Sequence, residues 1–136
     1  MDKELSVKIF NSGDFKSLTK PEQTIFRNVV ELLDQKGLLD PADAPVIAGY
    51  ARNVVLARIA AKDVQRMGTV IAFQDRGCDK WKINPAVDIL QRAQAAYEAT
   101  AVKLGLTPTG RKRLKGEGKP KKSKLEEFNE QFNEEG

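Results

Sequence analysis

Residues 68–85, GTVIAFQDRGCDKWKINP, decide the fold, because the hydrophobic period of the sequence changes there. TVIAF is rich in residues that favour strands, QDRGCD is typical of a turn, and KWKI alternates polar and apolar side chains. The pattern predicts a β-hairpin with a loop longer than two residues. Because a two-stranded ribbon alone is marginally stable in water, we expect it to pack on the helices or on a neighbouring subunit, with Trp81 as the anchor.

Long helical patterns flank this hairpin on both sides. Before it, apolar residues three and four apart predict a helix from 45 to 67 that ends at Gly68. After it, Asn84 supplies an N-cap and Pro85 the first position of a helix that ends at Gly105. The predicted framework is therefore two long helices joined at one end by a short hairpin.

The helix at 45–67 is apolar over much of its circumference. One seam consists of Ile47, Tyr50, Val54, Ala57, Ala61 and Val64. Further apolar surface comes from Ala48, Val55, Leu56, Ile59, Ala60 and Met67. Such a helix needs more than one packing partner, and in a chain of 136 residues we expect some partners to be other subunits. The helix after the hairpin is rich in alanine, which permits close helix–helix approach.

The N-terminal part of the sequence contains one clear helix. Thr19 and Glu22 have capping-box spacing, and Gly37 supplies a stop, so a helix is expected from 20 to 36. NSGDFKSL, residues 11–18, is expected to be irregular, within an N-terminal arm of residues 1–18. A short turn should precede the helix at 45–67, because Pro45 disfavours helical geometry in the residue before it.

These patterns predict a mainly α fold. It comprises an N-terminal helix pair, two long core helices joined by a short β-hairpin, and a disordered, charged C-terminal tail. The corresponding division is an arm (1–18), a helical domain (19–114) that is expected to oligomerise, and a flexible tail (115–136).

The charge is distributed in blocks along the chain. The net charge of +4 combines a balance of +1 in residues 1–102, +8 in residues 103–124 and −5 in residues 125–136. Basic blocks are typical of nucleic-acid binding and acidic blocks of protein docking, although a charged tail can also serve solubility alone.

We predict that the basic segment contacts nucleic acid first and the helix at 45–67 second. The first set is Arg111, Lys112, Arg113, Lys115, Lys119, Lys121, Lys122 and Lys124. The second set, Arg58, Lys62 and Arg66, has i, i+4, i+8 spacing, for which an ordinary solvated face is the simpler interpretation. Base stacking by Trp81 is a weaker alternative to packing. Phosphate contacts position without specifying sequence, so sharp specificity is not expected.

The acidic end of the sequence has apolar residues at helical spacing. Leu125, Phe128 and Phe132 stand at i, i+3 and i+7, with glutamates around them. Anchors of this kind are typical of helix-in-groove recognition. We predict that they dock on an external partner; folding back on the chain's own domain is the alternative.

The residues needed for catalysis are missing from the sequence. There is no histidine, and the single Cys78 can form neither an intrachain disulfide nor a structural zinc site. GEGKPKKS, residues 116–123, lacks the spacing of a phosphate-binding loop. We therefore expect no enzymatic activity, metal or cofactor. No signal peptide or membrane span is recognisable, so a soluble, intracellular protein is expected.

Segments within residues 68–114, GTVIAF, GCDKWKINPAV and AYEATAVKLGLTPTGRKRL, resemble the small subunit of tailed-phage terminases. LLDPADAPVIAGYAR, residues 38–52, resembles the lead-in helix of that family. The resemblance implies a non-catalytic adaptor in the host cytoplasm. It would bind double-stranded viral DNA, recruit and regulate the large-subunit ATPase–nuclease, and assemble as a ring of roughly eight to twelve subunits.

Two other functions remain open at this level. The first is a monomeric or dimeric transcription regulator of winged-helix type. Its N-terminal helix pair would read DNA, and residues 68–83 would form the wing. The first turns of the helix at 45–67 offer only Arg52 and Asn53 as base readers, which is too few for direct readout. The second is a host-directed adaptor that binds no nucleic acid.

Overall fold

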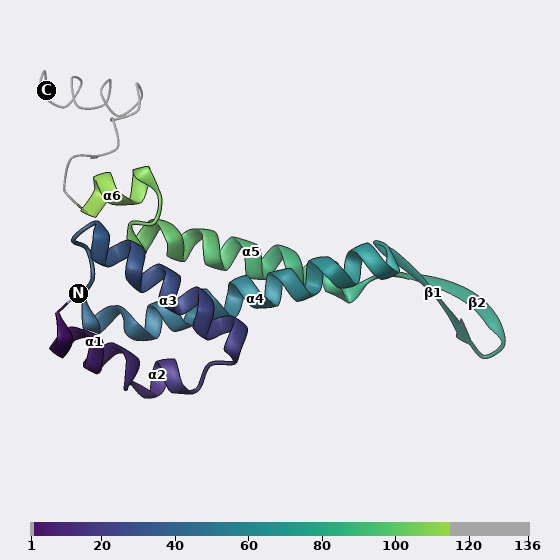
Figure 1. Cartoon of the computed structure of the whole chain (residues 1–136). Helices are drawn as coiled ribbons and strands as arrows, with labels where there is room; N and C mark the ends of the chain where they lie inside the picture. Colours follow the sequence, from purple (N-terminus) through teal and green to yellow (C-terminus); the bar gives the residue numbers. More distant parts are fainter. Residues whose placement is uncertain (1, 115–136) are drawn as a thin grey trace, which may run out of the picture.

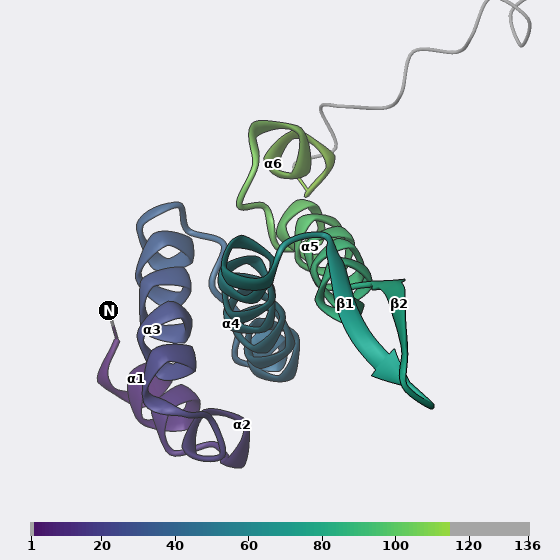
Figure 2. The same ribbon diagram turned by 90° about the vertical axis from the view of Figure 1, so that its right-hand side faces the viewer.

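The computed structural model describes residues 2–114. Three helices lie side by side, with α4 (Ala44–Met67) between α3 (Lys20–Gln35) and α5 (Pro85–Leu104) (Figure 2). The smaller elements are α1 (Lys3–Phe10), α2 (Gly13–Lys16), the 3-10 turn η1 (Pro41–Asp43), β1 (Val70–Asp75), β2 (Cys78–Ile83) and α6 (Pro108–Leu114). The predicted mainly α class, with two long helices joined by a hairpin, is confirmed.

The hydrophobic core lies in the N-terminal part of the molecule. Phe26 of α3 is completely buried, and its ring contacts those of Phe15 and Phe10 at centroid distances of 5.1 and 6.2 Å. α1, α2, α3 and the first half of α4 all contribute buried residues, and Leu104 at the end of α5 completes the cluster. This core holds α4 and α5 at one end and leaves their other ends outside it.

The irregular conformation predicted for residues 11–18 is wrong. Ser12 Oγ accepts a hydrogen bond from Phe15 N at 3.4 Å and caps α2, which buries Phe15 and, just beyond it, Leu18. α1 precedes this helix and buries Ile9. Both helices are too short for a hydrophobic period to be recognised in the sequence. Only the structure, in which they are packed into the core, identifies them.

The predicted boundaries of α3 and α4 agree closely with the structure. Glu22 Oε1 accepts a hydrogen bond from Thr19 N at 3.0 Å, as a capping box requires, and Gly37 follows the helix with a φ of 68°. η1 is the short turn expected before α4.

α4 and α5 form a slim pair that extends beyond the core and has the hairpin at its far end (Figure 1). Buried alanines line the contact: Ala57 and Ala60 on α4, and Ala86 and Ala93 on α5. Small side chains let the two backbones approach closely, as predicted. The exposed apolar residues of this pair therefore lie on its outer surfaces.

The hairpin loop is shorter than predicted. Asp75 pairs with Cys78, so only Arg76 and Gly77 form the loop, with φ values of 53° and 80°. Positive φ at both positions is the geometry of a type I′ turn, for which Asn-Gly and Asp-Gly are the usual sequences. The Arg-Gly sequence found here does not indicate such a turn, because an arginine rarely adopts the left-handed conformation.

Trp81 does not anchor the hairpin to the chain's own helices; its side chain is 71% exposed. The base of the hairpin is instead held by Asn84, which is almost completely buried. Asn84 Nδ2 donates to Gly68 O at 2.9 Å, and Asn84 Oδ1 accepts from Ala86 N at 3.0 Å. One side chain thus ties the end of α4 to the start of α5.

Candidate nucleic-acid interface

α6 places the first basic residues against the end of α5. Thr107 Oγ1 accepts a hydrogen bond from Gly110 N at 3.0 Å and starts the helix. Gly110 is buried so tightly on α5 that a Cβ there would lie 2.9 and 3.0 Å from the Val102 carbonyl carbon and Cα, and closer still to its oxygen. α6 is therefore a docked helix with a defined outward face.

Gly105 makes the turn between α5 and α6 possible. Its φ of 79° is left-handed, and the side chains of Leu38 and Leu114 pack against the space that a Cβ would fill. Leu38 follows α3 and Leu114 ends α6. The contact brings the end of α3, the end of α5 and α6 together.

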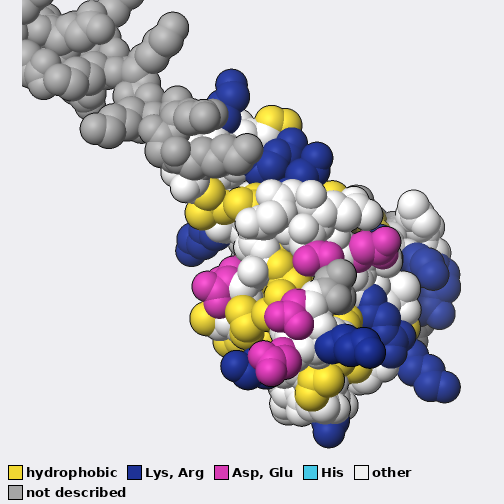
Figure 3. Space-filling model, turned by 60° about the vertical axis from the view of Figure 1, so that its left-hand side comes forward, with side chains coloured by type: hydrophobic (Ala, Val, Ile, Leu, Met, Phe, Trp, Pro, Cys, Tyr) yellow, Lys and Arg dark blue, Asp and Glu magenta, His cyan; other side chains and the backbone are white. Residues whose placement is uncertain are grey.

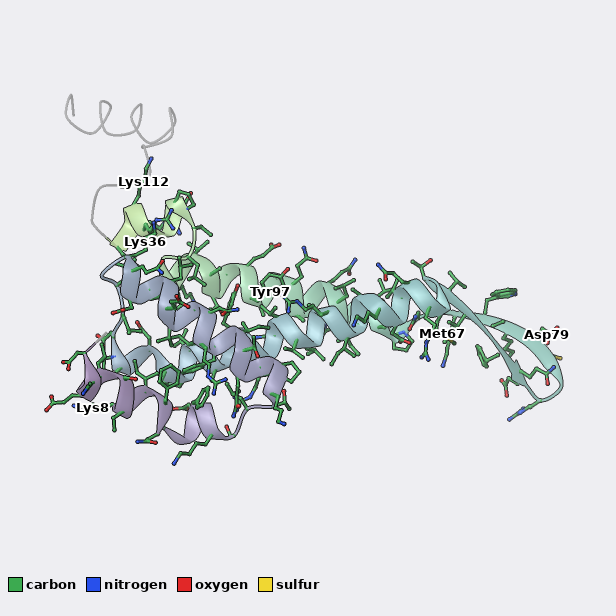
Figure 4. The ribbon with its side chains drawn as sticks, viewed as in Figure 1. Lys8, Lys36, Met67, Asp79, Tyr97 and Lys112 are labelled. Carbon is green, nitrogen blue, oxygen red and sulfur yellow. The ribbon has the colours of Figure 1, made fainter. Side chains whose placement is uncertain are left out.

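The three predicted DNA contacts on α6 differ in their surroundings. Arg111 is half-buried, and its Nη1 donates to Leu106 O at 3.5 Å, so it also helps to hold the turn before α6. Lys112 and Arg113 are exposed, and neither forms a salt bridge within residues 2–114. Figure 4 shows Lys112 directed away from the body of the molecule. Lys112 and Arg113 are thus the α6 side chains most accessible to a phosphate.

The structure adds two lysines that sequence reasoning missed. Lys36, after the last residue of α3, lies at the same end of the molecule as Lys112 (Figure 4), and Lys103 is exposed in the last turn of α5. Lys and Arg side chains gather beside α6 in Figure 3, whereas the rest of that face mixes both signs. Lys103 belongs to the basic block of the sequence, but nothing local in the sequence connects Lys36 with it.

The remaining tail residues predicted to bind DNA or a partner lie outside the described residues. They are Lys115, Lys119, Lys121, Lys122, Lys124, Leu125, Phe128 and Phe132.

The three residues of the second predicted DNA site, on α4, are exposed but do not all line the same groove. Arg58 lines the groove between α4 and α5 that contains Tyr50 and Tyr97, whereas Lys62 and Arg66 line a groove on another side of the same helix pair. Arg66 is also paired with Asp63 at 3.1 Å. The three residues do not share one groove, which weakens them as a single phosphate-binding stripe.

Within residues 2–114, two titratable groups, Tyr50 and Asp43, have shifted pKa values. The pKa of Tyr50 is raised by burial and, to a smaller extent, by Tyr97. Arg58 lowers it, but by less than the other two effects raise it. Burial and the neighbouring Asp40 raise the pKa of Asp43. Residues 2–114 contain no group of three or more His, Cys, Asp or Glu side chains that could hold a metal ion. In the same range, none of the helices is both long and apolar enough for a membrane span.

The hairpin lies too far from the candidate base readers to act as the wing of a winged-helix reader. Arg52 and Asn53 stand in the first half of α4, whereas the hairpin stands at the far end of that helix (Figure 1). Arg52, one of the two candidate base readers, donates a hydrogen bond to Ser17 Oγ at 3.1 Å. A winged-helix protein needs its wing beside the reading helix, so the geometry disfavours the regulator.

The comparisons with known proteins agree with this geometry. A family model described as phage terminase, small subunit, matches residues 23–121, which is most of the chain. Comparison with curated proteins and with solved structures gives no significant match. The matched range includes α4, the hairpin, α5 and α6. The chain therefore belongs to the phage terminase small-subunit family.

Proposed function

We propose that this protein is a non-catalytic adaptor that binds double-stranded viral DNA, assembles as a ring and recruits the large terminase subunit in the host cytoplasm. Its family gives it a role in phage genome packaging. The observation that carries the DNA-binding part is the docked α6, which presents Lys112 and Arg113 to solvent at the start of the basic block.

The basic block acts through its phosphate contacts. It carries nine Lys/Arg against one Glu over residues 103–124, and such a density of positive charge favours a polyanion of any sequence. A ring presents many copies of this segment at once, so each copy needs only weak affinity. Lys36 extends the same basic surface to the end of α3.

The DNA-binding part is tested by replacing Lys112 and Arg113 with glutamine in one variant. Both side chains are exposed, so the fold should be preserved while phosphate contacts are lost. The slope of log K against log salt should become shallower by about 0.9 for each contact removed per subunit. Titration of duplex DNA at several salt concentrations, followed by fluorescence anisotropy, measures that slope.

Lys8 and Lys16 supply the matched control, because they are exposed on α1 and α2, away from α6. Their double glutamine variant removes the same charge and should keep the salt slope of the unmodified protein. Equal slopes for both double variants would contradict the role of α6, and DNA binding that does not change with salt would contradict the whole basic interface.

The acidic end is proposed to dock on the large subunit through Leu125, Phe128 and Phe132. Deleting residues 125–136 should then abolish stimulation of the large-subunit ATPase, because the apolar anchors are gone. Native mass should be unchanged, since the apolar helix surfaces remain. Assays of large-subunit ATPase activity with the full-length and with the truncated protein measure this effect. Undiminished stimulation by the truncated protein would show that docking occurs elsewhere.

A further inference from the structure

One face of the hairpin carries four apolar side chains, and they pack against no helix in the described part of the chain. The pairing places Val70 opposite Ile83, Ala72 opposite Trp81, and Gln74 opposite Asp79, and these six residues share one face of the ribbon. We call it the tryptophan face. Trp81 and Ile83 are 71% and 72% exposed, although they are the largest apolar side chains on it.

The side chains on the opposite face of the hairpin contact one another and the end of α4. Lys82 Nζ lies 5.3 Å from the centre of the Phe73 ring, and Lys80 pairs with Asp75 at 2.9 Å. Ile71, also on this face, is half-buried and lines a depression together with Met67 of α4. The hairpin therefore turns this face toward its own helices and leaves the tryptophan face to solvent.

A second apolar surface lies on the outside of the α4–α5 pair. Leu56 and Ile59 of α4 and Ile89 of α5 are exposed there, and Ile59 is 61% exposed. They line a groove of about 460 Å³ whose polar residues are Lys62, Asp63 and Arg66. This volume is in the range of small-ligand pockets, so the groove can accept a large side chain such as an indole. We call it the isoleucine groove.

We propose that the tryptophan face of one subunit docks into the isoleucine groove of a second copy of this chain. The proposal rests on the ring assembly proposed above and names the two surfaces that build it. A chain does not fill its own groove with its tryptophan face, because its hairpin turns the opposite face toward α4 and α5. Ile71 and Lys82 of that face line a depression that shares Arg66 and Ile89 with the isoleucine groove. A two-stranded ribbon is marginal in water, and a neighbouring copy supplies the missing support.

The charges of the two surfaces are complementary. Asp79 is the one charged residue of the tryptophan face. In the isoleucine groove, Arg66 neutralises Asp63 at 3.1 Å, which leaves Lys62 as the surplus charge; it forms no salt bridge within residues 2–114. Apolar contact at the centre with an acid facing a base at the edge is the usual anatomy of a protein interface.

This contact is head-to-tail. The two surfaces lie on different elements, so each copy offers one hairpin and one groove, and every docked copy leaves one of each for the next. Repeated heterologous contacts generate a ring if the rotation closes and a filament if it does not. The surplus apolar surface of α4, which its own core leaves exposed, is then covered by the neighbouring subunit.

The test uses the only tryptophan of the chain as a reporter. In the unmodified protein, native mass by light scattering should be a multiple of 15.1 kDa. Trp81 emission should shift to longer wavelength on dilution, as the indole leaves the groove. Ile59→Asp places a carboxylate in the groove and should weaken association at least about 100-fold, giving a 15.1 kDa species with long-wavelength emission. Trp81→Ser should give the same mass.

Val7→Asp is the matched control, because Val7 is 57% exposed on α1, far from both surfaces. It should keep the native mass of the unmodified protein. Circular dichroism of each variant confirms that the helices are intact, and Ile59 is sufficiently exposed for the aspartate to leave the monomer folded.

Mixing the two interface variants tests the head-to-tail arrangement itself. Ile59→Asp chains retain a working hairpin, and Trp81→Ser chains retain a working groove. An equimolar mixture should therefore form dimers of twice the chain mass and no larger species, and Trp81 emission should return to shorter wavelength. A contact between two hairpins or between two grooves would give no such rescue.

The outcomes separate this inference from the proposed function. If Ile59→Asp leaves the native mass unchanged, the ring stands and the two surfaces are wrong. If the oligomer keeps long-wavelength emission that shortens only when the large subunit is added, the tryptophan face serves that partner and the inference is overturned. A 15.1 kDa species at every concentration would overturn both the inference and the ring.

Discussion

Replacing Phe26 with alanine should lower the free energy of unfolding by about 3–5 kcal/mol. Phe26 is completely buried and packs against the rings of both Phe10 and Phe15, so its removal leaves a cavity that the surrounding helices cannot fill. The lost contacts join α1, α2 and α3 at one point. Because domains of this size are stable by about 5–15 kcal/mol, the change removes a large part of the total.

Urea denaturation followed by circular dichroism measures this effect. Leu32→Ala is the control on the same helix, because Leu32 is 37% exposed and should lose less than about 1.5 kcal/mol. Equal losses at the two positions would mean that the three-ring cluster does not form the centre of the core. A lower midpoint with an unchanged slope is expected, since the compactness of the two end states should not change.

Gly110→Val should detach α6 from α5. A valine Cβ would overlap the carbonyl group of Val102, and the backbone of α5 cannot move aside as a flexible side chain could. The loss of global stability is limited by the free energy with which α6 docks, so the core should unfold at nearly the original temperature. Backbone amides of residues 107–114 should lose most of their protection from hydrogen exchange, while those of α3 keep theirs.

Thr109→Val is the control for this prediction. It introduces the same β-branched residue into the same helix at the preceding position, which is exposed. Its hydrogen exchange should match that of the unmodified protein. If α6 keeps its protection in Gly110→Val, then the close approach to Val102 is not what holds the helix. Weaker DNA binding by Gly110→Val alone would further connect the docking of α6 with the proposed interface.

Most of the helical framework could be predicted, because its signals are local. Thr19 with Glu22 marks the start of α3, Asn84 with Pro85 the start of α5, and Gly105 the end of α5. A cap acts on backbone groups within one helical turn, so the residues responsible stand side by side in the sequence. The family resemblance in residues 68–114 rested on the same elements, and the family match includes them.

Other features could not be predicted, because residues distant in sequence decide them. α2 has four residues and forms because Phe15 meets Phe10 and Phe26. The two-residue hairpin loop depends on a left-handed arginine, for which the sequence gives no local sign. Lys36 joins the basic surface because the end of α3 lies near α6.

The order of the elements, most of their limits and the concentration of positive charge after α5 follow from local sequence, because caps, hydrophobic periods and charge are properties of neighbouring residues. Which apolar residues the chain's own core covers depends instead on tertiary packing. It buries Phe26 and leaves Trp81 and Ile59 exposed, although all three are large and apolar. Burial depends on how many elements pack around a position, and the slim α4–α5 pair with its hairpin extends beyond the elements that could cover it.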